Sequence, residues 1–304
     1  MRSFTFAKST LGLAAALAAP IAAQESSYFT MGTGMPVVLE RVDPLMSAGK
    51  ISNHVHSIVG GNGFAPTMDF AQTQTSDCST VPVIPDKSNY WMPALYYKSP
   101  HNGSFIRVPE LPNHKIYYKF GTHLNTADLE RSEFPKEFRM LTGNAMLRSN
   151  DGSSDVGGNE LNWQCHQPNY VTPTAIGFPK FTSCHGGGLA ATIRFPSCSN
   201  GQDFDSAKPN AHMAFPSAAD GLAGCTAPFN VKRFPEIMIE YWFDVDSFDG
   251  DYGMNDSPWT LAMGDNTGYG FHADFVRHLH SFMPGSELTT SRSMAGKLAG
   301  SKLL

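Results

Sequence analysis

Proline and glycine interrupt this sequence so often that few segments are long enough for an ordinary helix. The chain of 304 residues contains 21 Pro and 28 Gly. Short strand-forming runs bounded by Pro, Asn or Gly occupy residues 103–109 and 115–120, and longer alternating runs occupy residues 188–195 and 236–245. We therefore predict a mostly β fold, an antiparallel β-sandwich or jelly-roll-like domain with long loops and few short helices.

Three other segments read as strands. Residues 29–44 predict an opening strand, and residues 51–59 predict a strand from their alternation of apolar and polar side chains. Residues 86–97 are rich in Tyr and Trp, which favour strands, but Pro93 cannot donate to a backbone ladder. We therefore expect an edge or bulged strand over residues 86–97.

The N-terminal residues have the layout of a secretory signal peptide. Basic residues precede an apolar run over residues 11–19, and small residues around Ala23 offer a cleavage site. We divide the chain into a signal peptide (1–23), a single β-rich domain (24–285) and a flexible C-terminal tail (286–304). No stretch approaches the roughly 20 apolar residues that a transmembrane helix needs, so we expect a secreted protein without a transmembrane segment.

Charge gives no indication of a nucleic-acid or membrane partner. The formal net charge is −5, and Lys and Arg form no run after the signal peptide. Aromatic residues make up 12% of the chain and can provide flat surfaces on which sugars stack. This composition suits an extracellular protein whose aromatic side chains contact sugars or other ring-bearing ligands.

Five cysteines, none in a Cys-x-x-Cys pair, argue against a zinc ribbon and for disulfides formed in an oxidising compartment. The local candidates are Cys165 with Cys184 and Cys198 with Cys225, although the sequence leaves other connectivities open. This pairing leaves Cys78 without a partner, and we expect it to be a buried, inert thiol.

The densest group of chemically active side chains lies in residues 49–69. If residues 51–59 form a strand, His54 and His56 point to the same side of it, and Asp69 follows a glycine turn. A structural histidine pair needs a hydrogen-bond partner for each imidazole, whereas a functional pair shares a metal, a proton or a ligand. Both interpretations stay open for this pair.

His272 and Asp274 repeat the same spacing in a glycine-rich segment near the C-terminal end. An imidazole and a carboxylate on one face suit general acid–base catalysis, because Asp can orient the His that transfers the proton. We predict that these residues share one cleft with several others from distant parts of the chain. The predicted site residues are His54, His56, Asp69, Lys87, His212, Asp265, His272 and Asp274.

The same residues allow a second chemistry, in which His54, His56 and His272 bind zinc or another first-row divalent ion. Their spacing does not choose between acid–base and metal chemistry, so the sequence identifies no cofactor. The sequence contains no G-x-S-x-G, H-E-x-x-H or P-loop motif, so a serine hydrolase, a zincin or a P-loop nucleotide-binding protein is not supported.

Several blocks in fixed order resemble the fungal secreted family called domain of unknown function 1996 (DUF1996). The blocks occupy residues 40–69, 86–97, 134–144, 187–198, 210–217 and 263–275. The resemblance covers all eight predicted site residues, together with Asp43, Gly60, Asp86 and Tyr90. It departs at Ser199, where family members commonly have Trp. Because this domain often stands beside sugar-binding WSC modules, the resemblance implies a cell-wall or extracellular glycan setting.

The residues and the resemblance together predict a secreted protein that binds or acts on an extracellular glycan through a His/Asp-lined cleft. Acid–base cleavage is one candidate reaction. One alternative is a non-catalytic glycan-binding or cell-wall structural protein, in which the same side chains form a rigid hydrogen-bonded core. Another is a metal-dependent enzyme that uses the three histidines as ligands.

Overall fold

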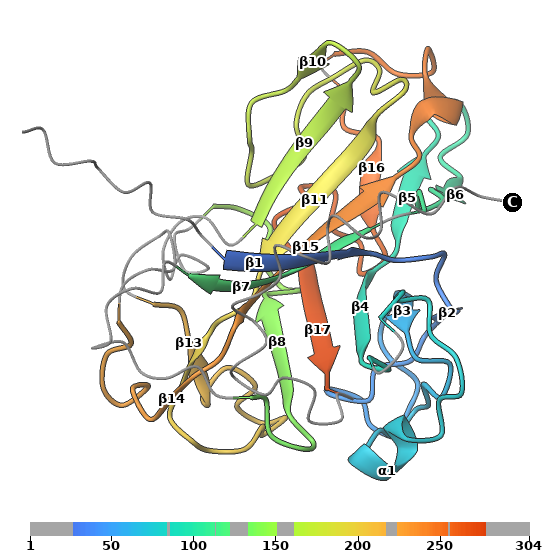
Figure 1. The fold of residues 1–304 in the computed structure, drawn as a ribbon. Helices are drawn as coiled ribbons and strands as arrows, with labels where there is room; N and C mark the ends of the chain where they lie inside the picture. The colour runs from blue at the N-terminus through green and yellow to red at the C-terminus, as the bar shows by residue number, and fades with distance from the viewer. Residues whose placement is uncertain are drawn as a thin grey trace, which may run out of the picture.

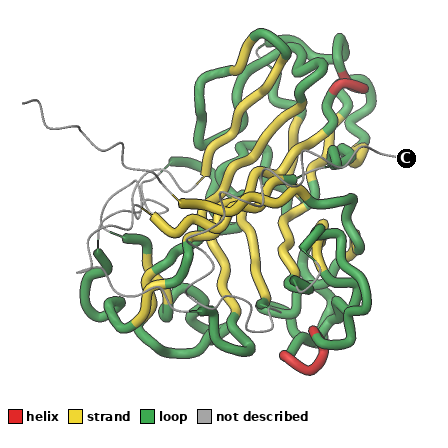
Figure 2. Tube along the Cα trace, viewed as in Figure 1, coloured by secondary structure: helices red, strands yellow, loops and turns green. Residues whose placement is uncertain are grey.

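Antiparallel sheets make up most of this computed structural model, which confirms the predicted fold class (Figure 1). The structure describes residues 27–277 except 84–85, 113, 122–132, 151–160, 217–223 and 255. Long loops join the strands, and helix is confined to α1 (Phe70–Thr73) and the 3-10 turn η1 (Asp246–Phe248) within the described part of the chain (Figure 2). The predicted signal peptide and C-terminal tail lie outside the described residues.

The largest sheet has six strands in the order β1-β7-β15-β11-β9-β10. In that order the strands are Ser27–Gly32, Lys115–Gly121, Glu236–Phe243, Gly188–Arg194, Leu161–Gln167 and Tyr170–Val171. The two long strands predicted from alternation are confirmed as β11 and β15, and they pair with Ile193 opposite Ile239. Both isoleucines are fully buried, so the apolar positions of the alternation form the core.

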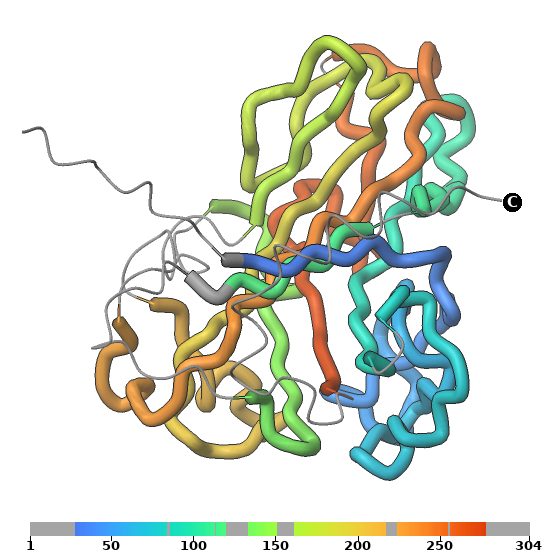
Figure 3. The backbone as a smooth tube through the Cα atoms, in the orientation of Figure 1, coloured from blue at the N-terminus to red at the C-terminus, as the bar shows by residue number. Residues whose placement is uncertain are grey.

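A five-stranded sheet, in the order β2-β3-β4-β17-β8, brings together segments that are far apart in the sequence. Its strands are Val38–Glu40, His56–Gly60, Asn89–Pro93, His272–Val276 and Arg139–Gly143. Figure 3 shows the consequence, because the red segment near the C-terminal end runs beside segments coloured blue-green from the first third of the chain.

Two small sheets complete the fold. One has the order β16-β5-β6, with strands Trp259–Leu261, Leu95–Lys98 and Phe105–Arg107. The other has the order β13-β12-β14, with strands Met213–Ala214, Cys198–Ser199 and Lys232–Arg233. The second sheet includes one end of a disulfide, since Cys198 belongs to β12.

The two faces of the five-stranded sheet are covered by different groups of apolar side chains. Tyr90 and Phe275 face the main core that this sheet shares with the six-stranded sheet. Ile58, Trp91 and Val276 face the opposite side, where they form a smaller apolar cluster with Leu45. This smaller face also carries the histidines described below.

Several predicted strand boundaries were wrong. Residues 29–44 contain two separate strands, β1 and β2. Residues 86–97 also form two strands, and β4 is an interior strand between β3 and β17 rather than an edge strand. Pro93 is tolerated because it is the last residue of β4, where the ladder ends. The strand predicted over residues 51–59 begins only at His56.

The disulfide prediction is confirmed, and the prediction for the remaining thiol was wrong. Cys165 pairs with Cys184 and Cys198 pairs with Cys225. Cys78 has a free thiol but is exposed rather than buried. It lies in an irregular segment after α1, where no sheet covers it.

Candidate metal centre

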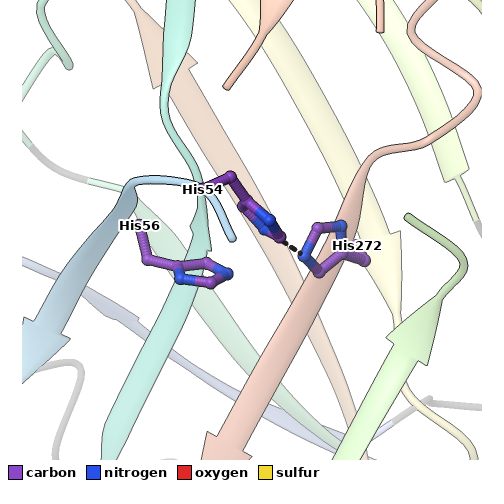
Figure 4. A group of neighbouring side chains, drawn as sticks. All are labelled: His54, His56 and His272. Atoms are coloured by element: carbon purple, nitrogen blue, oxygen red, sulfur yellow. Dashed lines mark hydrogen bonds between the residues drawn. The ribbon is translucent and has the colours of Figure 1, made fainter. Parts of the chain in front are cut away.

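Three imidazoles from distant parts of the chain meet at one end of the five-stranded sheet (Figure 4). The Nε2 atoms of His54 and His272 are 3.1 Å apart. The ring centroid of His56 lies 4.2 Å from that of His54 and 5.8 Å from that of His272. One nitrogen from each ring lies within 4.8 Å of the others, which is close enough for all three to bind one ion.

Strand register explains how two of these histidines come together. His56 lies opposite Pro93 in β4, and Asp274 of β17 lies opposite Trp91, so Pro93 separates His56 from His272. Side chains two positions apart on a strand share a face, and neighbouring strands are about 4.8 Å apart. The side chains of His56 and His272 therefore project from the same face of the sheet, with Pro93 between them.

His54 reaches the same point from the bend that precedes β3, not from the strand. The alternation argument therefore paired His54 with His56 for the wrong physical reason, although the two rings are neighbours. His54 is half-buried, whereas His56 and His272 are 0% and 8% exposed. Solvent therefore reaches the cluster past His54.

Hydrogen bonds to backbone carbonyl oxygens orient two of the three rings. His56 Nδ1 lies 3.0 Å from the carbonyl oxygen of Val42, and His272 Nδ1 lies 3.0 Å from that of Gly270. A carbonyl only accepts, so each Nδ1 carries the proton and donates, and each Nε2 keeps a lone pair. Metal-binding histidines are commonly oriented by such a bond from the ring nitrogen that does not bind the ion.

The electrostatics favour neutral imidazoles. Burial, and then the neighbouring His272 and Arg41, lower the pKa of His54 from 6.5 to about 4. Burial also lowers the pKa of His56 and of His272. Neutral imidazole is the form that binds metal, so protons compete weakly for these nitrogens near neutral pH.

Asp265 supports the Gly270 carbonyl without touching the cluster. It is fully buried, and its carboxylate accepts from the backbone N–H of Thr267 at 2.8 Å and of Gly270 at 2.7 Å. These bonds fix the turn that precedes β17. The predicted site residue Asp265 therefore positions His272 through Gly270.

Gly143 of β8 packs directly against the backbone of His272. Gly143 lies opposite His272, with Pro93 on the other side. A Cβ at Gly143 would lie 2.5 Å from the Phe271 carbonyl oxygen and 2.8 Å from the Cα of His272, and its φ of +82° also disfavours other residues. At position 143, therefore, only glycine fits without displacing His272.

Two carboxyl groups lie near the histidines. Asp274 is 2% exposed, one position along the same face from His272, and its Oδ2 has no hydrogen-bond partner among the described residues. Burial and the nearby Asp43 raise the pKa of Asp274 well above its usual value. Asp43 accepts backbone N–H bonds from Leu45 and Met46 at 3.0 and 3.1 Å, and burial raises its pKa.

The other three predicted site residues lie outside this cluster. Asp69 caps α1 by accepting from Gln72 N at 2.6 Å, and Lys87 Nζ donates to the Asp77 carbonyl at 3.2 Å. His212 donates through Nε2 to the Arg139 carbonyl at 2.8 Å. Each of these side chains is used in local structure.

A second group of possible ligands, His185, Asp246 and Asp249, lies on the surface. His185 Nδ1 lies 3.1 Å from Asp246 Oδ2, and the side chain of His185 is 81% exposed. Ser183 Oγ donates to Asp249 Oδ2. Hydrogen bonds within the protein therefore already occupy part of this group.

Sequence reasoning missed the groups that orient the ligands. The carbonyls of Val42 and Gly270 have no sequence signal, because every residue has a carbonyl. Gly143 could have been found, since it belongs to a block that carries the family resemblance. Arg41, whose Nε donates to the carbonyl oxygen of Ser52 two residues before His54, was not among the predicted site residues.

Comparisons with known proteins identify a family and no individual relative. No curated protein and no solved structure matches the chain. Among the described residues, no helix is long and apolar enough to cross a membrane. The family model described as domain of unknown function (DUF1996) matches residues 43–278, which include all three histidines. The chain therefore belongs to the DUF1996 family.

Proposed function

We propose that this protein is a metal-dependent enzyme whose ion is bound by Nε2 of His54, His56 and His272. The observation that carries the proposal is the convergence of three imidazoles with Nδ1 of two of them held by carbonyls. Two nitrogens bound at about 2.05 Å to a tetrahedral zinc lie about 3.3 Å apart. The 3.1 Å between Nε2 of His54 and Nε2 of His272 is close to that value.

The number of protein ligands supports a catalytic rather than a structural ion. Structural zinc sites have four protein ligands, whereas catalytic sites have three and leave one position for water or substrate. Three imidazoles also suit copper and other first-row divalent ions, so the ligand set defines a group of metals. The bound ion would supply a Lewis acid or an activated water.

An unfilled hydrogen-bonding requirement also supports a ligand at this point. Nε2 of His56 is buried and has no hydrogen-bond partner among the described residues. A buried polar atom without a partner costs about 1–3 kcal/mol. An ion bound to Nε2 would remove that cost.

Acid–base catalysis by the histidines alone has less support. A general acid or base works best with a pKa near the working pH, and burial lowers the pKa of His54 to about 4. No carboxylate of the described residues accepts from these imidazoles; carbonyls do. A purely structural role also has less support, because Nε2 of His56 has no hydrogen-bond partner among the described residues.

An extracellular glycan remains the substrate class to test first, and we propose that the protein acts outside the cell. Two disulfides among the described residues support an oxidising compartment. The test incubates metal-loaded protein with plant and fungal cell-wall polysaccharides, followed by mass spectrometry of released products. A binding protein without catalysis would pull down one of the polysaccharides and release nothing.

The decisive experiment measures metal content. Purified protein would be stripped with a chelator, loaded separately with zinc, copper, cobalt or manganese, and analysed for bound ions. We expect about one tightly bound ion per chain, with affinity reduced at least about 100-fold in His54→Ala because one of three protein ligands is lost.

Two matched variants control this experiment. His101→Ala removes an exposed histidine in a loop, and His212→Ala removes a histidine that donates to a carbonyl. Both should keep full metal binding. The metal centre is disproved if the wild type binds none of these ions with a Kd tighter than micromolar. It is also disproved if His54→Ala binds the ion as tightly as the wild type does.

A further inference from the structure

The side chain of Arg41 lies at the solvent-exposed edge of the histidine cluster and is fixed in place there. Its Nε donates to the carbonyl oxygen of Ser52 at 2.7 Å. In return, the backbone N–H of Ser52 donates to the Arg41 carbonyl at 3.0 Å. These two bonds join the segment before Val42 to the segment before His54.

Both of these segments belong to the proposed centre. Val42, the residue after Arg41, supplies the carbonyl that orients His56. Ser52 is two residues before His54, the ligand past which solvent reaches the cluster. Arg41 is exposed and is bonded to the segment that leads to His54, so its guanidinium lies on the side of the centre that solvent reaches.

The terminal nitrogens of Arg41 are available for a ligand. Arg41 is exposed, and no carboxylate of the described residues lies within ion-pair distance of it. The charged side chains nearby on these two segments are Glu40 and Lys50, both exposed, and the buried Asp43. A guanidinium anchored through Nε presents Nη1 and Nη2 as a planar fork that matches the two oxygens of a carboxylate or phosphate.

We propose that Arg41 binds an oxyanion of the substrate and holds it next to the ion. This inference rests on the proposed metal centre and names the class of substrate. A cation in the centre and a guanidinium beside it repel each other, and an anion placed between them removes that repulsion. For a glycan substrate, the matching group is the carboxylate of an acidic sugar.

The test uses cobalt-loaded protein, because the visible absorption of bound cobalt reports ligands that enter its open position. Acetate is the carboxylate probe and inorganic phosphate is the second probe, each titrated at constant ionic strength. We expect acetate to change the spectrum of the wild type. Arg41→Gln should weaken acetate binding about 10- to 100-fold, the range for hydrogen bonds to a charged group.

Two further variants separate the fork from simple charge. Arg41→Lys keeps the charge without the fork and should also lose affinity. Lys50→Gln removes one exposed charge from the segment before His54 and should change acetate binding less than about twofold. Equal effects of Arg41→Gln and Lys50→Gln would overturn the proposal, as would wild-type protein whose cobalt spectrum ignores both probes.

The outcomes for the ion and for the anion are distinguishable. If cobalt does not bind, the metal centre itself fails. If cobalt binds equally well to the wild type and Arg41→Gln, and acetate affinity is the same in both, only the role of Arg41 fails. Tighter binding of acetate than of phosphate would assign a carboxylate substrate, and the reverse order would assign a phosphate.

Discussion

The buried histidine cluster and the surface group of His185, Asp246 and Asp249 both bring three possible ligands together, yet their chemistry differs. In the buried cluster, backbone carbonyls accept from Nδ1 of His56 and of His272, so Nε2 of each ring faces the other histidines. In the surface group, His185 pairs directly with Asp246. Hydrogen bonds to the far nitrogen orient metal-binding histidines, and only the buried cluster has such bonds from carbonyls.

The two groups also differ in what holds them. His56 and His272 lie on interior strands of one sheet, so their separation is set by strand spacing. Asp246 and Asp249 belong to the short turn η1 and the residue after it, and His185 belongs to a loop. A site on sheet strands keeps its geometry with little loss of entropy when an ion binds.

The largest expected effect concerns ion-dependent stability. An ion at 1,000 times its Kd stabilises the folded state by about 4 kcal/mol, which corresponds to a rise in Tm of roughly 8–16 °C for a domain of this size. By differential scanning fluorimetry with and without chelator, we expect this rise in the wild type and in His185→Ala, and a rise no larger than about 3–6 °C in His54→Ala, because its affinity is at least about 100-fold lower. If the ion-dependent rise in Tm were instead absent in His185→Ala, the surface group rather than the histidine cluster would be the group that binds the ion.

The next effect comes from Gly143, beside His272. Gly143→Ala places a methyl group against the Phe271 carbonyl and the backbone of His272 at a positive φ. We expect a loss of about 2–4 kcal/mol in the free energy of unfolding and weaker ion binding, because His272 must move.

Gly103→Ala is the matched control for that substitution. Gly103 has a φ of +72°, and no heavy atom lies within 4 Å of the position of a Cβ. It should show only the conformational cost of about 1 kcal/mol, with ion affinity unchanged. Equal losses in both variants would mean that close packing at Gly143 is unimportant.

A smaller effect is a pH dependence of the metal-free protein. The pKa of His54 is about 4 in the folded state and 6.5 when the side chain is solvated, so the unfolded state binds more protons between these values. The contribution of neutral His54 to the free energy of unfolding is therefore complete above about pH 6.5 and is lost as the pH falls toward 4. Urea unfolding from pH 7.5 to 4 should therefore be less steeply pH-dependent in His54→Gln than in the wild type.

The smallest effect is expected at the surface group. Asp246→Asn removes the charge that pairs with the exposed His185. Exposed ion pairs contribute about 0–1 kcal/mol, so chemical unfolding should change by less than that. Metal content should be unaffected. A larger loss of stability that added metal restores would show that the surface group also binds an ion.

The sequence could predict the long strands and the members of the cluster for a clear physical reason. Alternation over residues 188–195 and 236–245 reflects one buried and one exposed face, and it predicts β11 and β15. His54, His56 and His272 were recognisable as possible ligands by residue type. Their contact depends on β4 lying between β3 and β17, and strand order is a long-range property that local patterns do not contain.

Other parts of the candidate site depended on turns that the sequence does not specify. Asp69 and His212 were predicted site residues by residue type, yet Asp69 caps α1 and His212 donates to the Arg139 carbonyl. Their roles follow from the position of a single hydrogen-bond partner. Residue type therefore gave candidates, and backbone geometry selected among them.

The use of carbonyls to orient His56 and His272 affects how the site tolerates amino-acid replacement. Val42 contributes only its main chain to His56, so substitution by other residues of similar volume should leave the ligand in place. Gly270 differs, because a Cβ there would lie 2.9 Å from an oxygen of Asp265. In a saturation mutagenesis screen, position 42 should therefore accept many residues and position 270 almost none, although both supply the same chemical group.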